Sequence, residues 1–137
     1  MTLSLSDPSL LKHQAYVDGQ WIDADNGETF AVTNPANGEL IVEVAKLGAA
    51  ETSRAISAAQ RGMDEWKKRP AKARAGILRK WFDLMMANQE DLAIIMTAEQ
   101  GKVLAESRGE IAYGASFVEW FCEEAKRIDG DVIPGPS

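Results

Sequence analysis

The longest helical pattern in the chain covers residues 102–128, KVLAESRGEIAYGASFVEWFCEEAKRI, and is closed by Asp-Gly. Two apolar stripes run along it at helical spacing. One stripe is aromatic and consists of Tyr113, Phe117 and Trp120. The other recurs at steps of three and four through Ile111, Gly114, Ala115, Val118, Phe121, Cys122, Ala125 and Ile128. A helix that is apolar on two sides needs two covers, so we expect upstream elements on one side and a further cover on the other.

Three shorter helices are predicted upstream of this one. The first ends at Arg69, and Pro70 then takes the first position of the second. Asn88 is expected to cap the third with Asp91 three residues on, and Gly101 to end it in a left-handed conformation. Their apolar stripes are Ala55, Ile56, Ala59, Met63 and Trp66, then Ile77, Leu78, Trp81, Leu84 and Met85, then Leu92, Ile95 and Met96. These stripes predict a layer of amphipathic helices.

Short strands separated by turns are predicted before the helices. The pair Asp18-Gly19 lies between two β-prone runs and is the strongest local signal for a tight hairpin. Further turn residues occur at 25–27 and 34–38, between runs such as TFAVT and LIVEV. We therefore expect three or four short strands in an antiparallel ribbon, with helices against one face.

The predicted fold class is α+β: an N-terminal antiparallel β-ribbon followed by about four helices. Residues 1–13 have no periodicity and form an arm, and residues 14–47 form the ribbon. Residues 48–130 are helical. Residues 131–137 contain Val-Ile and then Pro-Gly-Pro, which indicates the start of a truncated next strand.

The composition indicates a globular protein. Of the residues, 45% are hydrophobic and 26% are charged, and no apolar run approaches the roughly 20 residues of a membrane-spanning helix. The net charge of −6 argues against nucleic-acid binding, which needs a basic face. The N-terminus lacks a secretory pattern and the single cysteine fits a reducing compartment, so a cytoplasmic protein is expected.

One basic stretch, residues 67–80, contains no acidic residue. It is either a patch for an anion or a partner, or a solvated helix face balanced by acidic residues further on. We favour the second interpretation because the basic residues are spread around the helix. The balancing residues are then Glu119, Glu123 and Glu124.

The sequence contains few groups that could carry out a reaction. It has no Gly-x-Gly-x-x-Gly, no phosphate loop, no Gly-x-Ser-x-Gly and no Cys or His cluster with metal spacing. Cys122 lies on the apolar stripe deep in a helix, so we interpret it as a structural residue. Glu106 and Glu110 are spaced for acid–base work but are expected on a solvated helix edge. His13 has no companions that would make it a metal ligand.

Five motifs then occur in a defined order. They are Tyr16–Trp21 (YVDGQW), Thr33–Glu39 (TNPANGE), Arg79–Met85 (RKWFDLM), Thr97–Lys102 (TAEQGK) and Ser116–Phe121 (SFVEWF). Together with the order of elements, they resemble the N-terminal part of the aldehyde dehydrogenase superfamily, and within it the bacterial succinate-semialdehyde dehydrogenases. The resemblance covers the chain from about residue 14 to its end.

The resemblance implies that the chain is a truncated piece of a longer homodimeric or homotetrameric enzyme. That enzyme would oxidise succinate semialdehyde or a similar small aldehyde with NAD or NADP. A cysteine attacks the aldehyde, hydride leaves to the nicotinamide, and a glutamate-activated water releases the acid. The family's catalytic and cofactor-binding residues match none in this segment and would lie downstream of Ser137. Residues 48–130 would belong to the dinucleotide-binding domain, and this piece alone would be inactive.

The family's site residues carry over to few positions here. The resemblance implies that Tyr113 lines the tunnel through which the aldehyde enters, and that Phe117 and Trp120 share this role. Some relatives also hold a monovalent cation through positions that match Thr33 and Glu99. The cation site is therefore expected to involve these two residues.

Two positions depart from the family's pattern. Val103 replaces the proline that usually follows the Gly-Lys pair, which is expected to let the helix start earlier. Cys122 replaces a small residue, usually alanine. It does not match the family's nucleophile motif, so no catalytic role is assigned to it.

A second hypothesis makes the chain a free-standing helical interaction module. The helix with two apolar stripes would then serve self-association, without catalysis. Such a module should form a defined monomer or dimer, whereas a piece of an enzyme with an uncovered apolar face should associate in a concentration-dependent way.

Overall fold

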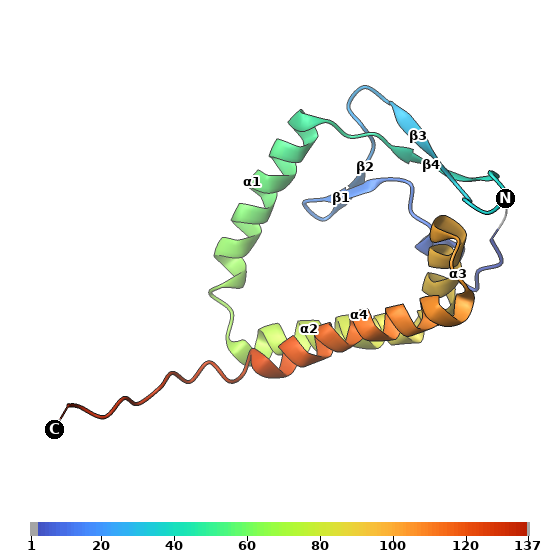
Figure 1. The fold of residues 1–137 in the computed structure, drawn as a ribbon. Coiled ribbons are helices and arrows are strands. Elements are labelled where there is room, and N and C mark those ends of the chain that lie inside the picture. The colour runs from blue at the N-terminus through green and yellow to red at the C-terminus, as the bar shows by residue number, and fades with distance from the viewer. Residues whose placement is uncertain (1–2, 137) are drawn as a thin grey trace.

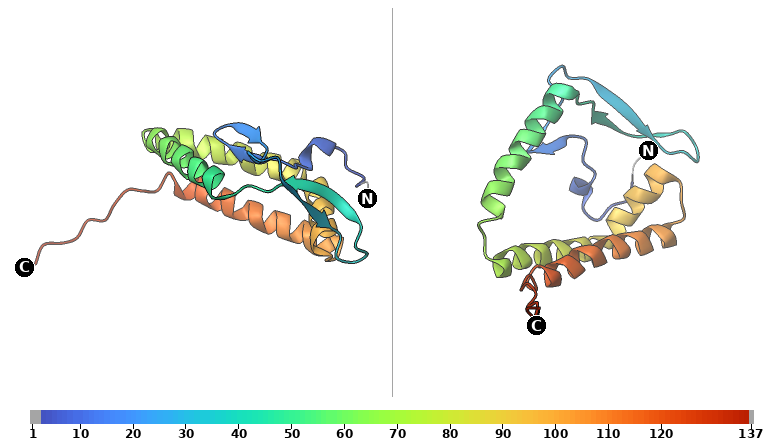
Figure 2. Two further views of the ribbon diagram at one scale, coloured as in Figure 1. Left: turned by 90° about the horizontal axis from the view of Figure 1, so that it is seen from above. Right: turned by 60° about the vertical axis from the view of Figure 1, so that its left-hand side comes forward.

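In residues 3–136, which this computed structural model describes, helices and hairpins lie around an open frame (Figure 1). The elements are η1 (Pro8–Leu10), β1 (Ala15–Val17), β2 (Gln20–Ile22), β3 (Thr29–Thr33), β4 (Leu40–Ala45), α1 (Ala49–Trp66), α2 (Ala71–Ala87), α3 (Gln89–Gln100) and α4 (Leu104–Glu124). α1 forms one side of the frame, and α2 and α4 lie side by side along another (Figure 2). The predicted α+β class is confirmed. Met1 and Thr2 of the predicted arm and Ser137 of the predicted strand lie outside the described residues.

The first hairpin joins β1 to β2 at Asp18 and Gly19, as predicted. Asp18 has φ 52° and Gly19 has φ 81°. Two consecutive positive φ angles are typical of the type I′ turn, whose twist matches that of the paired strands. Tyr16 and Trp21 face each other across the pair, with ring centroids 5.2 Å apart.

The second hairpin pairs β3 with β4, and the ribbon is split into two separate two-stranded sheets. The split has a cause in the connection between β2 and β3. The main-chain N–H of Asp25 donates to Glu51 of α1 at 3.0 Å, and the Asp25 carboxylate accepts two bonds from Arg54. These bonds hold the connection against α1, so the second hairpin does not continue the first.

α1 begins directly after Gly48, but most of its predicted apolar stripe is uncovered. Ala58 is the one apolar side chain buried within this described helix. Ile56 is 65% exposed and Met63 is 54% exposed. The helical period was predicted correctly, but the described chain covers the stripe only in part, since Ala55 and Trp66 are half-buried and the other members are exposed.

The junction of α2 and α3 corrects the prediction for Asn88. Its side-chain amide donates to the carbonyl of Leu84 at 2.8 Å, so it closes α2 and makes no cap for α3. The Asp91 carboxylate instead accepts the main-chain N–H groups of Ser6 at 2.9 Å and Asp7 at 2.8 Å. The expected capping pair is wrong, because α3 follows α2 at once and Asp91 holds the N-terminal arm.

α4 is shorter than residues 102–128. Val103 is extended, with φ −67° and ψ 143°, so the expectation that it lets the helix start earlier is wrong. Phe121 and Ile128 of the predicted buried stripe are exposed. The residues of α4 that are buried are Ser107, Ile111, Ala115 and Cys122.

Gly101 ends α3 in a left-handed conformation with φ 74°, as predicted. A Cβ atom at this position would lie 2.8 Å from the Cγ atom of Pro35, closer than real contacts allow. The turn after β3 therefore sits against the corner between α3 and α4. In the same corner, the hydroxyls of Thr97 and Ser107 are hydrogen-bonded at 2.8 Å.

The buried core is small for a chain of this length. Its apolar members are Ala24, Ile41, Ala58, Ala75, Ala93, Ala98, Ile111, Ala115 and Cys122. The chain has a solvent-accessible surface of 9622 Å², whereas a compact monomer of 15.0 kDa exposes about 7,000 Å². The additional accessible surface is consistent with an open frame whose helix faces are exposed.

Residues after α4 form an extended tail. Val132 is 98% exposed and Ile133 is 85% exposed, and the strand expected there is absent from the described part of the tail. An isolated strand has no neighbour with which to pair its backbone groups. Among residues 3–136, no helix has the length and apolar character needed to cross a membrane.

Candidate functional site

The aromatic stripe of α4 lies on an exposed helix face. Tyr113, Phe117 and Trp120 are 65%, 48% and 64% exposed. The rings of Tyr113 and Phe117 meet edge to face, with centroids 4.9 Å apart and planes at 80°. The opposite side of α4 packs on α2 and α3. The structure thus brings the three predicted residues together on the side of α4 that lacks a cover in the described chain.

A hollow of about 690 Å³ lies beside this stripe. Phe117, Trp120 and Phe121 form its apolar side, and Arg79 of α2 and Glu119 are among its charged residues. Its lining contains no cysteine or histidine. The hollow therefore offers apolar contact and fixed charges but no strong nucleophile.

Arg79 connects α2 to α4 at the rim of this hollow. Its guanidinium donates to Glu119 at 2.8 Å and to Glu123 at 3.2 Å. The hydrogen bonds that Arg79 donates to Glu119, and then to Glu123, raise the pKa of Arg79. Lys126, then Arg79, lower the pKa of Glu123 by hydrogen bonding. The prediction that acidic residues of the last helix balance the basic stretch is confirmed at Arg79.

Cys122 is a buried structural residue, as predicted. Its side chain is 3% exposed, and its thiol donates to the carbonyl of Ala75 on α2 at 3.1 Å. This bond adds a second polar connection between α2 and α4, one helical turn from Arg79.

The remaining candidate groups are solvated. Glu106 and Glu110 are both exposed, and Glu110 pairs with Lys102. His13 is also exposed, and its main-chain carbonyl accepts a bond from Ala45 at 2.8 Å. Residues 3–136 contain no group of three or more His, Cys, Asp or Glu that could hold a metal ion.

Thr33 and Glu99 come from elements that meet at one corner. Thr33 ends β3 where the strand register is irregular, and Glu99 lies in the last turn of α3. The contact between Pro35 and Gly101 brings these two elements together. A direct contact between Thr33 and Glu99 is not recorded among the described residues, and the cation site stays a prediction.

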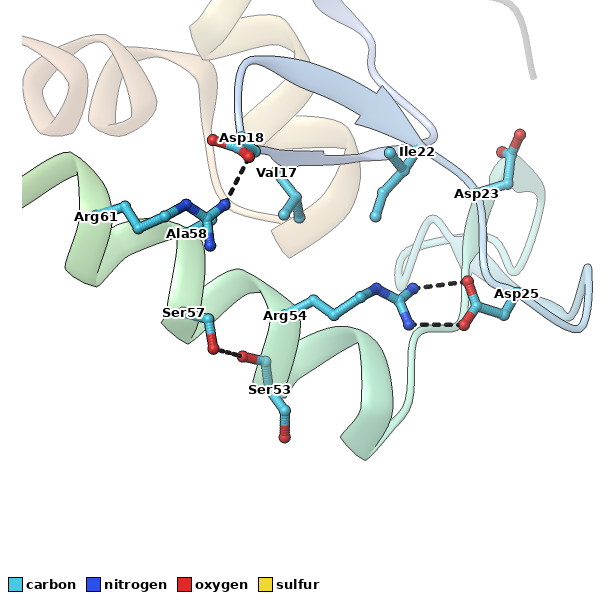
Figure 3. Close-up of a pocket in the computed structure, with 10 residues that line it drawn as sticks. All are labelled: Val17, Asp18, Ile22, Asp23, Asp25, Ser53, Arg54, Ser57, Ala58 and Arg61. Carbon is cyan, nitrogen blue, oxygen red and sulfur yellow. Dashed lines mark hydrogen bonds and ion pairs between the residues drawn. The ribbon is translucent and has the colours of Figure 1, made fainter.

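A second hollow, of about 510 Å³, lies between the first hairpin and α1 and was not among the predicted sites (Figure 3). The guanidinium of Arg54 donates two hydrogen bonds to the Asp25 carboxylate, at 2.9 and 2.7 Å, and Arg61 donates one to Asp18 at 2.8 Å. Hydrogen bonds from the N–H groups of Asp25, of Glu51 itself and of the residue before α1 lower the pKa of Glu51. Because both arginines already have carboxylate partners, their role is to hold the first hairpin and the connection after it against α1. Their spacing of seven residues on one helix face was the available signal.

Comparison with known proteins places residues 21–137 in the pattern of the Aldehyde dehydrogenase family. The chain is 62% identical to a glutarate-semialdehyde dehydrogenase of Pseudomonas aeruginosa over 97% of its length, and covers 28% of that relative. It is 57% identical to the NADP(+) succinate-semialdehyde dehydrogenase of Escherichia coli, with the same two coverages. A solved succinate-semialdehyde dehydrogenase of Burkholderia pseudomallei superposes with a TM-score of 0.92 at 59% identity, covering 98% of this chain and 28% of that one. The chain thus spans less than a third of these relatives.

Proposed function

Because this chain belongs to the aldehyde dehydrogenase family, we propose that it is the N-terminal part of an NAD(P)-dependent enzyme that oxidises a small semialdehyde. Succinate semialdehyde and glutarate semialdehyde are the substrates that the names of the similar proteins favour. The proposed enzyme is a cytoplasmic homodimer or homotetramer, and the segment alone is inactive.

The observation that carries this proposal is the uncovered aromatic face of α4. A face with Tyr113, Phe117 and Trp120 exposed needs a cover in a stable protein. The relatives contain more than twice as much additional chain, which supplies candidates for that cover. We propose that the three side chains line the aldehyde tunnel between this segment and the rest of the enzyme.

The cofactor is assigned to the rest of the enzyme. A dinucleotide is usually held by a glycine-rich turn at a helix N-terminus, and this sequence has no Gly-x-Gly-x-x-Gly. The residues present therefore do not form such a cradle. What this segment contributes is the shape and apolar character of the substrate entrance.

A chimera tests the proposed function. Residues 1–137 would replace the matching segment of the Escherichia coli enzyme, to which they are 57% identical. We expect NADP-dependent oxidation of succinate semialdehyde by the chimera and no saturable NADP binding by the isolated chain in calorimetry. A folded chimera without activity would contradict the proposal.

The tunnel role is tested in the same chimera. Phe117→Ala and Trp120→Ala should raise KM for the aldehyde about tenfold without changing KM for NADP, because they would remove contacts with the aldehyde alone. The control is Phe30→Ala, which removes an aromatic ring that is 51% exposed on β3. Equal effects of all three substitutions would refute a tunnel at α4.

We also propose that Thr33 and Glu99 belong to a monovalent cation site. Activity or thermal stability of the chimera should then depend on sodium or potassium, and Glu99→Gln should weaken that dependence. The matched control is Glu106→Gln, another exposed glutamate. A cation response that is identical in the two variants would exclude Glu99 from the site.

The same uncovered face favours a second candidate, a self-associating helical module without catalysis. Sedimentation of the isolated chain separates the two. A single defined dimer that is lost in Trp120→Ser supports the module, whereas association that grows continuously with concentration supports an incomplete enzyme.

A further inference from the structure

Arg79 makes the most specific contact between α2 and α4. Glu119 and Glu123 are four residues apart and lie on one helix face, and the guanidinium reaches both. The Arg79 side chain is 37% exposed. Ion pairs this exposed contribute little to stability, so the contact must be judged by its geometry.

The two carboxylates lie between the two stripes of α4. Each residue turns a helix by about 100°. Glu119 and Glu123 therefore fall between Cys122, which faces α2, and Trp120, which is exposed on the aromatic side. A bond at this edge resists rotation of α4 about its own axis.

The buried side of α4 offers little resistance to such rotation. Its buried residues are small except for Ile111. Small side chains make few van der Waals contacts and interlock weakly. Two directional bonds are then the main restraint on rotation near the aromatic stripe: the bond from Arg79 at the edge, and the bond from the Cys122 thiol to Ala75 on the buried side.

We propose that Arg79 is a positioning residue, which fixes the rotation of α4 and thereby the direction in which Phe117 and Trp120 face the aldehyde. This inference rests on the proposed tunnel. The positioning role is distinct from the tunnel lining, because Arg79 belongs to α2 and acts on α4 through Glu119 and Glu123.

The test uses the chimera with Arg79→Leu. KM for succinate semialdehyde should rise roughly tenfold, while kcat and KM for NADP stay within about twofold. Arg79→Lys should raise KM for succinate semialdehyde less than Arg79→Leu does, because an ammonium group still reaches one carboxylate at a time. The matched control is Arg108→Leu. This substitution removes the two hydrogen bonds, both 2.7 Å long, that Arg108 donates to Glu90. Arg108 lies about three turns before Glu119 along α4, so KM should stay within about twofold.

A second measurement does not depend on activity. In a chimera whose accessible cysteines outside this segment are replaced by serine, spin labels on exposed Ser116→Cys of α4 and Lys80→Cys of α2 report the distance between the helices, while Cys122 stays buried. Arg79→Leu should broaden the distance distribution and Arg108→Leu should not.

The outcomes separate the two proposals. An inactive chimera with a broadened distribution contradicts the proposed function but supports the restraint. An active chimera that keeps its KM in Arg79→Leu, or an unchanged distribution, overturns the positioning role.

Discussion

α1 and α4 are both long amphipathic helices, yet they are held in different ways. α4 buries one side on α2 and α3 and adds directional bonds from Arg79 and Cys122. α1 buries a single apolar side chain, and it is joined by polar bonds from Arg61 to the turn of the first hairpin and from Arg54 to the connection that follows that hairpin. An apolar stripe in a sequence therefore predicts that a helix forms, but it does not predict that anything nearby covers it.

The largest expected difference compares two isoleucines. Ile111→Ala in α4 removes a side chain that is 9% exposed and should cost about 4 kcal/mol of unfolding free energy. Ile56→Ala in α1, where the side chain is 65% exposed, should cost less than about 0.5 kcal/mol. Urea unfolding of both variants measures the difference. Equal losses would mean that α1 is covered in solution, for example by another copy.

The corner between α3 and α4 should be nearly as sensitive. Gly101→Ala forces a left-handed conformation on alanine and drives its Cβ atom against Pro35, so a loss of about 3 kcal/mol is expected. Gly38→Ala has the same φ of 74° but open space around it, and should lose only about 1 kcal/mol. Thermal unfolding of both variants separates the cost of the left-handed conformation, which both share, from the cost of the contact with Pro35, which only Gly101→Ala has. If the two variants match, the contact with Pro35 adds nothing.

A smaller effect is expected where the arm meets α3. Asp91→Ala removes the acceptor of two main-chain N–H groups and should cost about 2 kcal/mol. Asp91→Asn retains one acceptor oxygen and should cost about half as much. Hydrogen exchange at Ser6 and Asp7 reports the release of the arm. Slow exchange that persists in Asp91→Ala would show that other contacts hold the arm.

The last comparison concerns Glu51, at the start of α1, which accepts the main-chain N–H groups of Asp25 and Gly48. Its pKa is lowered in the folded chain, so its stabilising effect is complete above its usual pKa, about 4.3, and is lost as the pH falls through the lowered value. The amide signals of Asp25 and Gly48 should shift as the carboxylate protonates. Glu51→Gln should abolish that titration, and a response that survives in this variant would point to another acid.

Local signals predicted much of this fold. The pair Asp18-Gly19 predicted the first hairpin, and Gly101 predicted the end of α3. The position of Cys122 on its apolar stripe predicted that its thiol is buried. Asn88 failed as a cap because the end of α2 competes for its side chain.

Long-range relations could not be predicted from the sequence. Asp91 contacts residues more than eighty positions earlier, and Asp25 joins α1 through Glu51. No local pattern marks Asp91 or Glu51 as the acceptor of main-chain N–H groups from a distant segment. The aromatic stripe was found from its spacing, whereas Arg79 became part of the site only when α2 was placed beside α4.

The corner between α1 and α2 is an exposed connection between two helices, and it suits limited proteolysis. Lys67, Lys68 and Arg69 lie there in succession, all exposed, in a short connection outside both helices. Trypsin should therefore cut after Lys67 or Lys68, and also after Lys126 or Arg127 at the start of the extended tail, while Pro70 protects the bond after Arg69. The two larger fragments would carry the hairpins with α1 and the three packed helices, respectively. Protection of this site in a longer protein would show that the joint has been covered.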